Sequence, residues 1–263
     1  MGERMRKSAV RRMRLLIEAV PSMAIVAVIC TTLIGCVVIR SNYPGDHALA
    51  NSITGRGDTA DTPAEEALVQ RGFLSRQIYY TAAVQLRTAT KGLPHNWAVV
   101  LDADGGILDD GQLRLEYART GHPLKYDYWI DWVKDRSAPM TAGAKYFIDT
   151  ARELGGKVII VTNRAASGCP DVRARLVSLD VHVDAVLCAA DGVLDKNPRF
   201  DDIRNGNAIA DAGPLEIKIF IGEQLSDFPN SSAAHPGDVS EFGVRFFLLP
   251  ALAPIKADGK DAT

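Results

Sequence analysis

The stretch Trp97-Ala-Val-Val-Leu-Asp102-Ala-Asp104-Gly-Gly-Ile-Leu-Asp-Asp110 joins a short apolar run to two aspartates and a glycine pair. The apolar run predicts a buried β-strand, and the two glycines predict that it ends in a loop. Residues i and i+2 of an extended chain face the same side, so Asp102 and Asp104 can act on one site. Two carboxylates that close repel one another unless they share a cation or a proton. We therefore expect a divalent metal ion beside them, at the end of a strand, where α/β sheets bind ligands.

The composition is that of a globular protein. At 263 residues, with 47% hydrophobic and 24% charged residues, the chain suits one sizeable domain with appendages. The first 40 residues contain seven basic and two acidic side chains, and the remainder contains 23 basic and 30 acidic ones, a net charge of about −7. Such a surface repels a phosphate backbone, so we expect no nucleic acid as partner.

The N-terminal segment predicts a membrane anchor or an export signal. A basic region, residues 1–18, precedes an uncharged run of 21 residues, 19–39, which is long enough to cross a bilayer as a helix. Basic residues stay on the cytoplasmic side, so we expect the rest of the chain in the cell envelope, on the periplasmic or extracytoplasmic side. An uncleaved transmembrane anchor is our first interpretation. A bacterial lipoprotein signal is the second, because Leu33-Ile-Gly-Cys36 resembles a cleavage box that would leave Cys36 lipidated.

The rest of the chain divides into a tether, a domain and a tail. Residues 40–61 are aperiodic and rich in Gly, Asn, Asp and Ser, which predicts a flexible tether. The globular domain is expected over residues 62–252, and residues 253–263 are expected to be frayed. Cys169 and Cys188 belong to the exported domain, where an oxidising compartment permits a disulfide. A disulfide between them and two buried free thiols both remain open.

Three helices are expected in the domain. Thr62-Pro63-Ala-Glu65 predicts the start of a helix that runs to about Thr90. Thr141 is expected to cap a second helix, and a third is expected over residues 172–179. The side chains expected on the buried side of the first helix are Leu68, Phe73, Ile78, Ala82 and Leu86.

Five apolar runs alternate with these helices and predict β-strands. Alternation of this kind is typical of an α/β fold with a central parallel sheet and helices on both faces. The polar, aromatic-rich stretch from Leu113 to Arg136 predicts a small inserted cap. The expected strands are Ala98–Leu101, Val158–Val161, Val181–Leu187, Ile217–Ile221 and Val244–Leu249.

Four polar clusters follow strands of this sheet. The carboxyl ends of parallel strands meet at one edge, so the four clusters are expected to gather there. Each cluster alone is common, but four in order at strand ends are specific. They are Asp102 with Asp104, Thr162-Asn163-Arg164, Lys196 with Arg199, and Gly222-Glu223-Gln-Leu-Ser-Asp227.

Phosphoryl transfer accounts for all four clusters. A carboxylate can attack phosphorus and form an aspartyl-phosphate, which divides a slow hydrolysis into two easier steps. A second carboxylate can protonate the leaving alkoxide and then activate water. A hydroxyl and backbone N–H groups can hold the phosphoryl oxygens, and a lysine can neutralise the transferring group. A further acid completes the oxygen ligands of Mg²⁺.

These motifs resemble those of the haloacid dehalogenase (HAD) superfamily, and within it the exported class B and class C acid phosphatases, including the bacterial lipoprotein type. The resemblance extends over about residues 77–250. It implies a Rossmann-like HAD fold and hydrolysis of small phosphomonoesters, with nucleoside monophosphates as candidate substrates. Besides the four clusters it includes Trp129-Ile-Asp-Trp132, Ala138-Pro139 to Gly143, Lys196-Asn-Pro-Arg199-Phe200 and Asp227-Phe228.

The resemblance also implies a role for each site residue. Asp102 would be the nucleophile and Asp104 the general acid and base. The phosphoryl group would be bound by Thr162, Asn163 and Lys196. The Mg²⁺ ligands would be the Asp102 side chain, the Asp104 backbone carbonyl, Glu223 and Asp227. The sequence gives no indication of an oligomer.

Three positions depart from the family pattern. An acid and a threonine usually follow the second aspartate, where this chain has Gly105-Gly106. The fourth motif usually begins Gly-Asp-Asn, and here it begins Gly222-Glu223-Gln224. The usual terminal signature after the last strand is absent from Leu249-Pro250 onward. These departures leave two alternatives open: a catalytically impaired envelope protein that binds a phosphorylated ligand, and a phosphotransferase.

Overall fold

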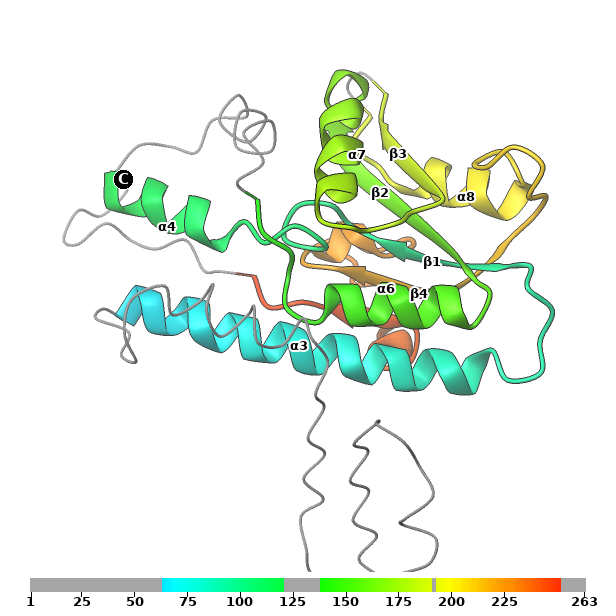
Figure 1. Cartoon of the computed structure of the whole chain (residues 1–263), viewed down its shortest axis with the longest axis horizontal. Helices are drawn as coiled ribbons and strands as arrows, with labels where there is room; N and C mark the ends of the chain where they lie inside the picture. Colours follow the sequence, from blue (N-terminus) through cyan, green and yellow to red (C-terminus); the bar gives the residue numbers. More distant parts are fainter. Residues whose placement is uncertain (1–62, 121–137, 191–192, 252–263) are drawn as a thin grey trace, which may run out of the picture. The chain divides into compact units, whose positions relative to one another are not determined.

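The computed structural model describes residues 63–120, 138–190 and 193–251 (Figure 1). The segments predicted as basic region, anchor, tether and tail lie outside the described residues, as does most of the predicted cap. Within the described ranges, none of the helices combines the length and the apolar character needed to cross a membrane.

Five parallel strands form one sheet, in the order β3-β2-β1-β4-β5. This arrangement confirms the predicted parallel sheet and places β1, the strand that precedes the two aspartates, at its centre. The third and fifth strands begin later than predicted. The Val181 N–H donates to the Leu176 carbonyl of the preceding helix, and the Val244 N–H donates to the Glu241 carbonyl in a turn. The strands are β1 (Trp97–Leu101), β2 (Lys157–Ala165), β3 (Ala185–Ala189), β4 (Glu216–Gly222) and β5 (Phe246–Leu248).

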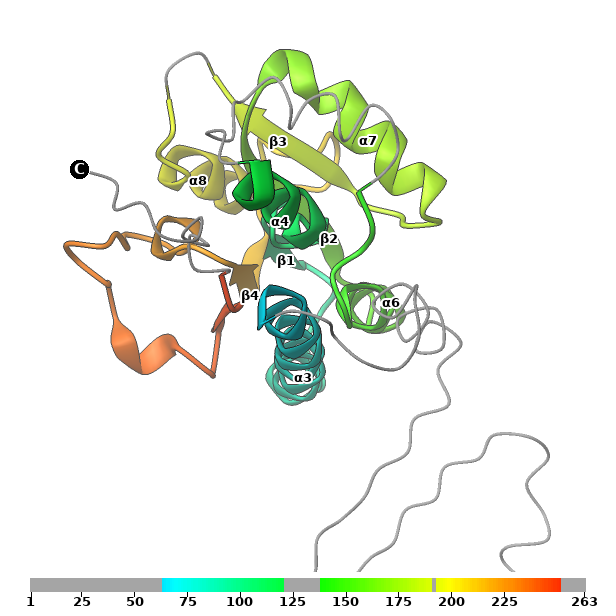
Figure 2. The same ribbon diagram turned by 90° about the vertical axis from the view of Figure 1, so that its left-hand side faces the viewer.

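Helices cover both faces of the sheet, as predicted. Val99 and Leu101 of β1 pack into one apolar cluster with α3 (Pro63–Ala89), α6 (Ala144–Glu153) and α7 (Cys169–Ser178). Ala98 and Val100 face the opposite cluster, which contains side chains of α8 (Asn197–Asn205). Figure 2 shows α8 across the sheet from α6 and α7. Because neighbouring residues of β1 face opposite clusters, all five are buried.

The first long helix is present as α3, but its buried face differs from the prediction. Phe73 is 64% exposed, so its predicted burial is wrong. The buried face is centred on Ser75 and Tyr79 and includes Arg71, whose charge is satisfied by carboxylates. An arginine with such partners can be buried, and hydropathy alone does not identify it.

Two other helical predictions need correction. Thr141 does not cap the second helix: α6 begins at Ala144, with Gly143 at its N-cap. Helix α8 was not predicted, although Pro198 near its first turn is a typical helix start. Its nine residues hold few apolar side chains, and these give a weak periodic signal.

A disulfide joins Cys169, the first residue of α7, to Cys188 in β3, with Cα atoms 6.1 Å apart. The alternative of two free thiols is therefore wrong. The bridge crosses from the helix that follows β2 to the neighbouring strand and fixes the edge of the sheet.

Candidate active site

The predicted site lies where the chain reverses its direction across the sheet. From β1 the chain proceeds to β2 and β3 on one side, and from β4 it proceeds to β5 on the other. The two strands are neighbours, and the Asp102 N–H donates to the Ile221 carbonyl of β4 at 2.9 Å. The segment after β1 and the segment 222–227 after β4 therefore meet at one point of the sheet edge. Such a reversal is the usual ligand-binding position of open α/β sheets.

Lys196 bridges two of the predicted site residues. Its Nζ atom lies 2.6 Å from Oδ1 of Asp102 and 2.6 Å from Oδ1 of Asp227. All three side chains are buried, and Lys196 stands at the N-cap of α8, which positions it. Three residues that are far apart in the sequence are thus in direct contact, as the strand-end pattern predicted.

Burial and neighbouring charges shift the pKa values of Asp102 and Lys196. Burial, opposed by Lys196 and reinforced by the carboxylates of Asp227 and Asp104, raises the pKa of Asp102 to about 8. Burial by itself lowers the pKa of Lys196, but the two carboxylates outweigh it and the pKa is raised. The site therefore holds more negative charge than one ammonium group balances.

Asp104 is held by an arginine. Nε and Nη2 of Arg164 each lie 2.7 Å from a carboxylate oxygen of Asp104, in a two-point ion pair. Arg164 is buried, whereas the Asp104 side chain is 21% exposed. This geometry fixes the carboxylate while leaving it accessible. Arg164 follows the predicted Thr-Asn pair, but its sequence position gave it no role.

Two of the predicted phosphate-binding residues, Thr162 and Asn163, lie in the last part of β2. Arg199, on α8, donates to the backbone carbonyl of Thr162 and, at 2.6 Å, to Oδ1 of Asn163. The Thr162 hydroxyl accepts the Arg164 N–H at 3.3 Å. Arg199 therefore orients the Asn163 amide and connects the last part of β2 to α8. The sequence placed Arg199 near the site without indicating these contacts.

Glu223 points into a separate ionic cluster. Its Oε1 atom lies 2.8 Å from Nη2 of Arg114, and its Oε2 atom lies 3.4 Å from Nη2 of Arg71. Arg71 comes from α3 and Arg114 from α4 (Gly111–Thr120), and both also contact Asp110. Burial and the neighbouring Asp110 raise the pKa of Glu223 to about 7, against the lowering effect of Arg114 and Arg71. Neither arginine was predicted as a site residue, because no sequence pattern distinguishes them from arginines on exposed helix faces.

Two of the departures from the family pattern fit one another in space. Gly105 has a φ of +74°, and a Cβ atom built there would overlap the Glu223 carboxyl group. A Cβ at Gly106 would overlap the Asp102 backbone carbonyl. The Tyr79 hydroxyl, buried under this loop, donates to the Gly106 carbonyl at 3.1 Å. The glycine pair thus makes room for the longer acid at position 223 and for the tight turn behind Asp102.

The donor chemistry suits magnesium at one part of the site. Asp102 and Asp227 offer carboxylate oxygens on the two sides of Lys196, and Mg²⁺ prefers such hard ligands. The excess of negative charge around Asp102 also suits a cation. Over the described ranges, no three Asp, Glu, His or Cys side chains converge as a ready-made metal site. Lysine and arginine groups instead contact the predicted ligands, and Glu223 is the one most engaged by them.

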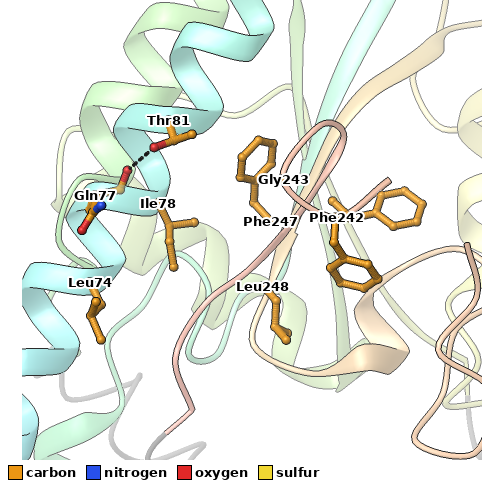
Figure 3. A pocket seen from close by; sticks show the side chains of 9 residues that line it. Leu74, Gln77, Ile78, Thr81, Phe242, Gly243, Phe247 and Leu248 are labelled. Atoms are coloured by element: carbon orange, nitrogen blue, oxygen red, sulfur yellow. Dashed lines mark hydrogen bonds between the residues drawn. The ribbon is translucent and has the colours of Figure 1, made fainter. Parts of the chain in front are cut away.

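A separate apolar pocket of about 490 Å³ lies between α3 and the β5 region (Figure 3). Leu74 and Ile78 of α3 face Phe247 and Leu248 across it. None of the predicted catalytic, phosphate-binding or metal-binding residues lines this pocket. The chemistry is therefore assigned to the sheet edge and not to the pocket.

Comparisons with known proteins agree with this fold. A family model described as HAD superfamily, subfamily IIIB (acid phosphatase) matches residues 70–252. The fold is similar to the structure of the class C acid phosphatase from Bacillus anthracis, with 22% identity, a TM-score of 0.60, and coverage of 78% of this chain and 83% of that chain. A crystal structure of the Bacillus anthracis class C acid phosphatase with tungstate bound gives the same identity and TM-score, with 84% of that chain covered. No curated protein sequence matches the chain.

Proposed function

Because the chain belongs to subfamily IIIB of the HAD superfamily, the acid phosphatases, we propose that it hydrolyses small phosphomonoesters through an aspartyl-phosphate intermediate. Its family makes it a phosphomonoesterase, and the mechanism is our proposal. The observation that carries it is the contact of Lys196 with both Asp102 and Asp227 at the reversal point of the sheet.

In the first step, an Asp102 carboxylate oxygen attacks phosphorus, a new O–P bond forms, and the bond to the ester oxygen breaks. Asp104 gives its proton to the departing alkoxide. Arg164 holds Asp104 in one orientation through two contacts of 2.7 Å. Lys196 offsets the charge of the attacking group and of the phosphoryl oxygens.

In the second step, Asp104 takes a proton from a water molecule, whose oxygen attacks phosphorus. The bond to Asp102 then breaks and inorganic phosphate leaves. In this proposal Thr162 and Asn163, near the end of β2, bind the phosphoryl oxygens, and the contact of Arg199 with Asn163 supports this role. Mg²⁺ bound by Asp102, the Asp104 carbonyl and Asp227, with Glu223 as a fourth candidate, would supply further positive charge for the phosphoryl group.

We also propose that the enzyme works outside the cytoplasm and accepts nucleoside monophosphates among its substrates. The Cys169–Cys188 disulfide supports an oxidising compartment. The uncharged run 19–39 supports export and a membrane anchor. The tungstate complex of the Bacillus anthracis protein supports a tetrahedral oxyanion as the bound group.

The test is hydrolysis of an aryl phosphate by the purified protein with and without EDTA. We expect Mg²⁺-dependent release of phosphate, and loss of activity by about 10³-fold or more in Asp102→Asn. The exposed Asp202→Asn is the matched control and should retain activity. Activity that persists in Asp102→Asn contradicts the mechanism.

The second candidate is a protein that binds a phosphorylated ligand without turnover. The engagement of Glu223 by Arg71 and Arg114 favours it, because this acid is the predicted metal ligand. Calorimetric binding of tungstate in the absence of any hydrolysis would select this candidate. Transfer of phosphate to an added nucleoside would instead identify a phosphotransferase.

A further inference from the structure

A buried ionic cluster lies beside the proposed catalytic site. It contains two guanidinium groups, from Arg71 and Arg114, and the carboxylates of Asp110 and Glu223. Asp110 is fully buried, and its two oxygens bind one arginine each, at 3.1 and 2.5 Å. Arg71 also pairs with Asp109, so every carboxylate of the cluster has an arginine partner in the metal-free protein. Glu223 is its link to the segment that follows β4.

We propose that Arg114 is an internal competitor for the divalent cation: its guanidinium group binds Glu223 in the metal-free protein and must release it before Glu223 can bind a metal ion. The proposal rests on the proposed function, because it concerns the metal ion of that reaction. A guanidinium group and a divalent cation cannot share one carboxylate closely without strong repulsion. The 2.8 Å contact of Arg114 with Oε1 of Glu223 therefore lowers the affinity of the site for the metal.

The contacts of the two arginines identify Arg114 as the group that moves. The side chain of Arg71 is 4% exposed, and it also contacts Asp109 and donates to the backbone carbonyl of Pro250 at 3.0 Å. A movement of Arg71 would break these contacts. Its Nη2 atom also lies farther from Glu223 than that of Arg114, at 3.4 Å from Oε2. The Arg114 side chain is 31% exposed, and its contacts include Asp110 and Glu223. Rotation toward solvent therefore costs Arg114 less, and it can keep the bond from its Nε atom to Asp110.

Glu223 lies beside Gly105, on the short segment that joins β4 to Asp227. Gly105 has no side chain, and the Glu223 carboxyl group occupies the space that a Cβ there would fill. Glu223 follows Gly222, the last residue of β4, and lies four residues before Asp227, which shares Lys196 with Asp102. A carboxylate on this short segment can serve either the arginines or a metal ion beside Asp102. In this proposal, Glu223 and Gly105 together allow one carboxylate to exchange between the arginines and the metal ion.

The experiment measures Mn²⁺ binding by electron paramagnetic resonance, with Mg²⁺ competition, on the complete protein. Arg114→Gln is expected to bind Mn²⁺ roughly three to ten times more tightly than the unaltered chain. Glu223→Gln is expected to bind it more weakly, and adding Arg114→Gln to this variant should give no gain, because the group that Arg114 competes for is gone. Arg204→Gln removes an exposed arginine that pairs with Asp201 and should leave the dissociation constant unchanged.

Three outcomes overturn the proposal. The first is an unchanged or weaker Mn²⁺ affinity in Arg114→Gln. The second is a gain in Mn²⁺ affinity from Arg114→Gln that is equally large in the Glu223→Gln background. The third is an equal gain in Mn²⁺ affinity in Arg204→Gln. Far-ultraviolet circular dichroism and thermal melting establish that each variant is folded. Should Arg114→Gln not fold, Glu223→Asp takes its place: the shorter carboxylate withdraws from Arg114 and is expected to bind Mn²⁺ more tightly, and an unchanged affinity overturns the proposal.

The metal measurement is independent of turnover. A protein that binds Mn²⁺ as expected but hydrolyses no phosphomonoester contradicts the proposed function and leaves the competition by Arg114 intact. A protein that hydrolyses the ester but shows no effect of Arg114→Gln on Mn²⁺ binding contradicts the competition by Arg114 and leaves the proposed function intact.

Discussion

At the scale of single residues, Glu223 and Gly105 illustrate how two departures from a family pattern compensate one another. The acid at position 223 is one methylene longer than the usual aspartate, and its carboxyl group fills the space beside Gly105. A residue with a side chain at position 105 would require either another backbone conformation or a shorter acid. Each departure considered alone indicates damage to the site, whereas together they indicate an altered but consistent arrangement.

This fit predicts the result of Gly105→Ala. The positive φ of Gly105 costs an alanine about 1 kcal/mol or more, and the overlap with Glu223 adds roughly 1–3 kcal/mol. Gly213→Ala is the matched control, since Gly213 also has a positive φ, +67°, but nothing lies near its added Cβ. Urea denaturation should show a larger loss of unfolding free energy for Gly105→Ala than for Gly213→Ala. Equal losses would mean that Glu223 moves away freely.

Arg164 is a positioning residue for the proposed acid and base. Arg164→Lys keeps the positive charge but replaces the two contacts with Asp104 by one at most. We expect kcat to fall roughly 10- to 100-fold with little change in KM. Arg204→Lys serves as control, and steady-state kinetics on an aryl phosphate provide the measurement. A rise in KM alone would place Arg164 in substrate binding.

At the scale of elements, the sheet was easier to predict than the helices and their contacts. The strands are uninterrupted apolar runs because both faces of a parallel sheet are covered, and such runs are visible in a sequence. Helix α8 is short and mostly polar, so it gave a weak signal, and Phe73 was placed on the wrong face of α3 because Arg71 is buried there by its ion pairs. Burial of a charged residue depends on partners from other elements, and local periodicity does not contain that information.

The disulfide between α7 and β3 predicts a defined loss of stability on reduction. It closes a loop of 19 residues, so its removal should lower the unfolding free energy by roughly 2–4 kcal/mol. Urea denaturation of the unaltered chain with and without dithiothreitol measures this loss. The variant Cys169→Ser/Cys188→Ser should be less stable and insensitive to dithiothreitol. Equal stability of the oxidised and reduced forms would contradict the prediction.

At the scale of the whole molecule, the parallel sheet and the meeting of polar residues at its edge were predictable, whereas the charge balance of the site was not. Asp102, Lys196 and Asp227 meet at the sheet edge because the carboxyl ends of parallel strands coincide. The partners of the other acids, Arg71 and Arg114, come from helices whose arginines have no distinguishing spacing. A strand-end pattern gives the place of a site, but the counter-ions that decide its metal affinity depend on side-chain contacts.

The buried acids predict how stability depends on pH in the metal-free protein. The pKa values of Asp102 and Glu223 are raised to about 8 and about 7, mainly by burial. Between about pH 4 and these values the folded state binds more protons than the unfolded state, so the unfolding free energy falls as the pH rises through this range. Thermal melting in EDTA should therefore give a higher Tm at pH 5 than at pH 8. Asp102→Asn should reduce this difference, and a Tm that rises from pH 5 to pH 8 would contradict the prediction.

The convergence of charges at the sheet edge also has a consequence for folding kinetics. The ionic groups of the site come from α3, α4, β2 and α8 and from the loops after β1 and β4, so the contacts among them span positions 71 to 227. Until the last of these segments docks, buried charges lack their counter-ions, and the site has no defined geometry. Recovery of enzymatic activity during refolding will therefore lag behind the return of helical circular dichroism, and it will report the completion of the native structure.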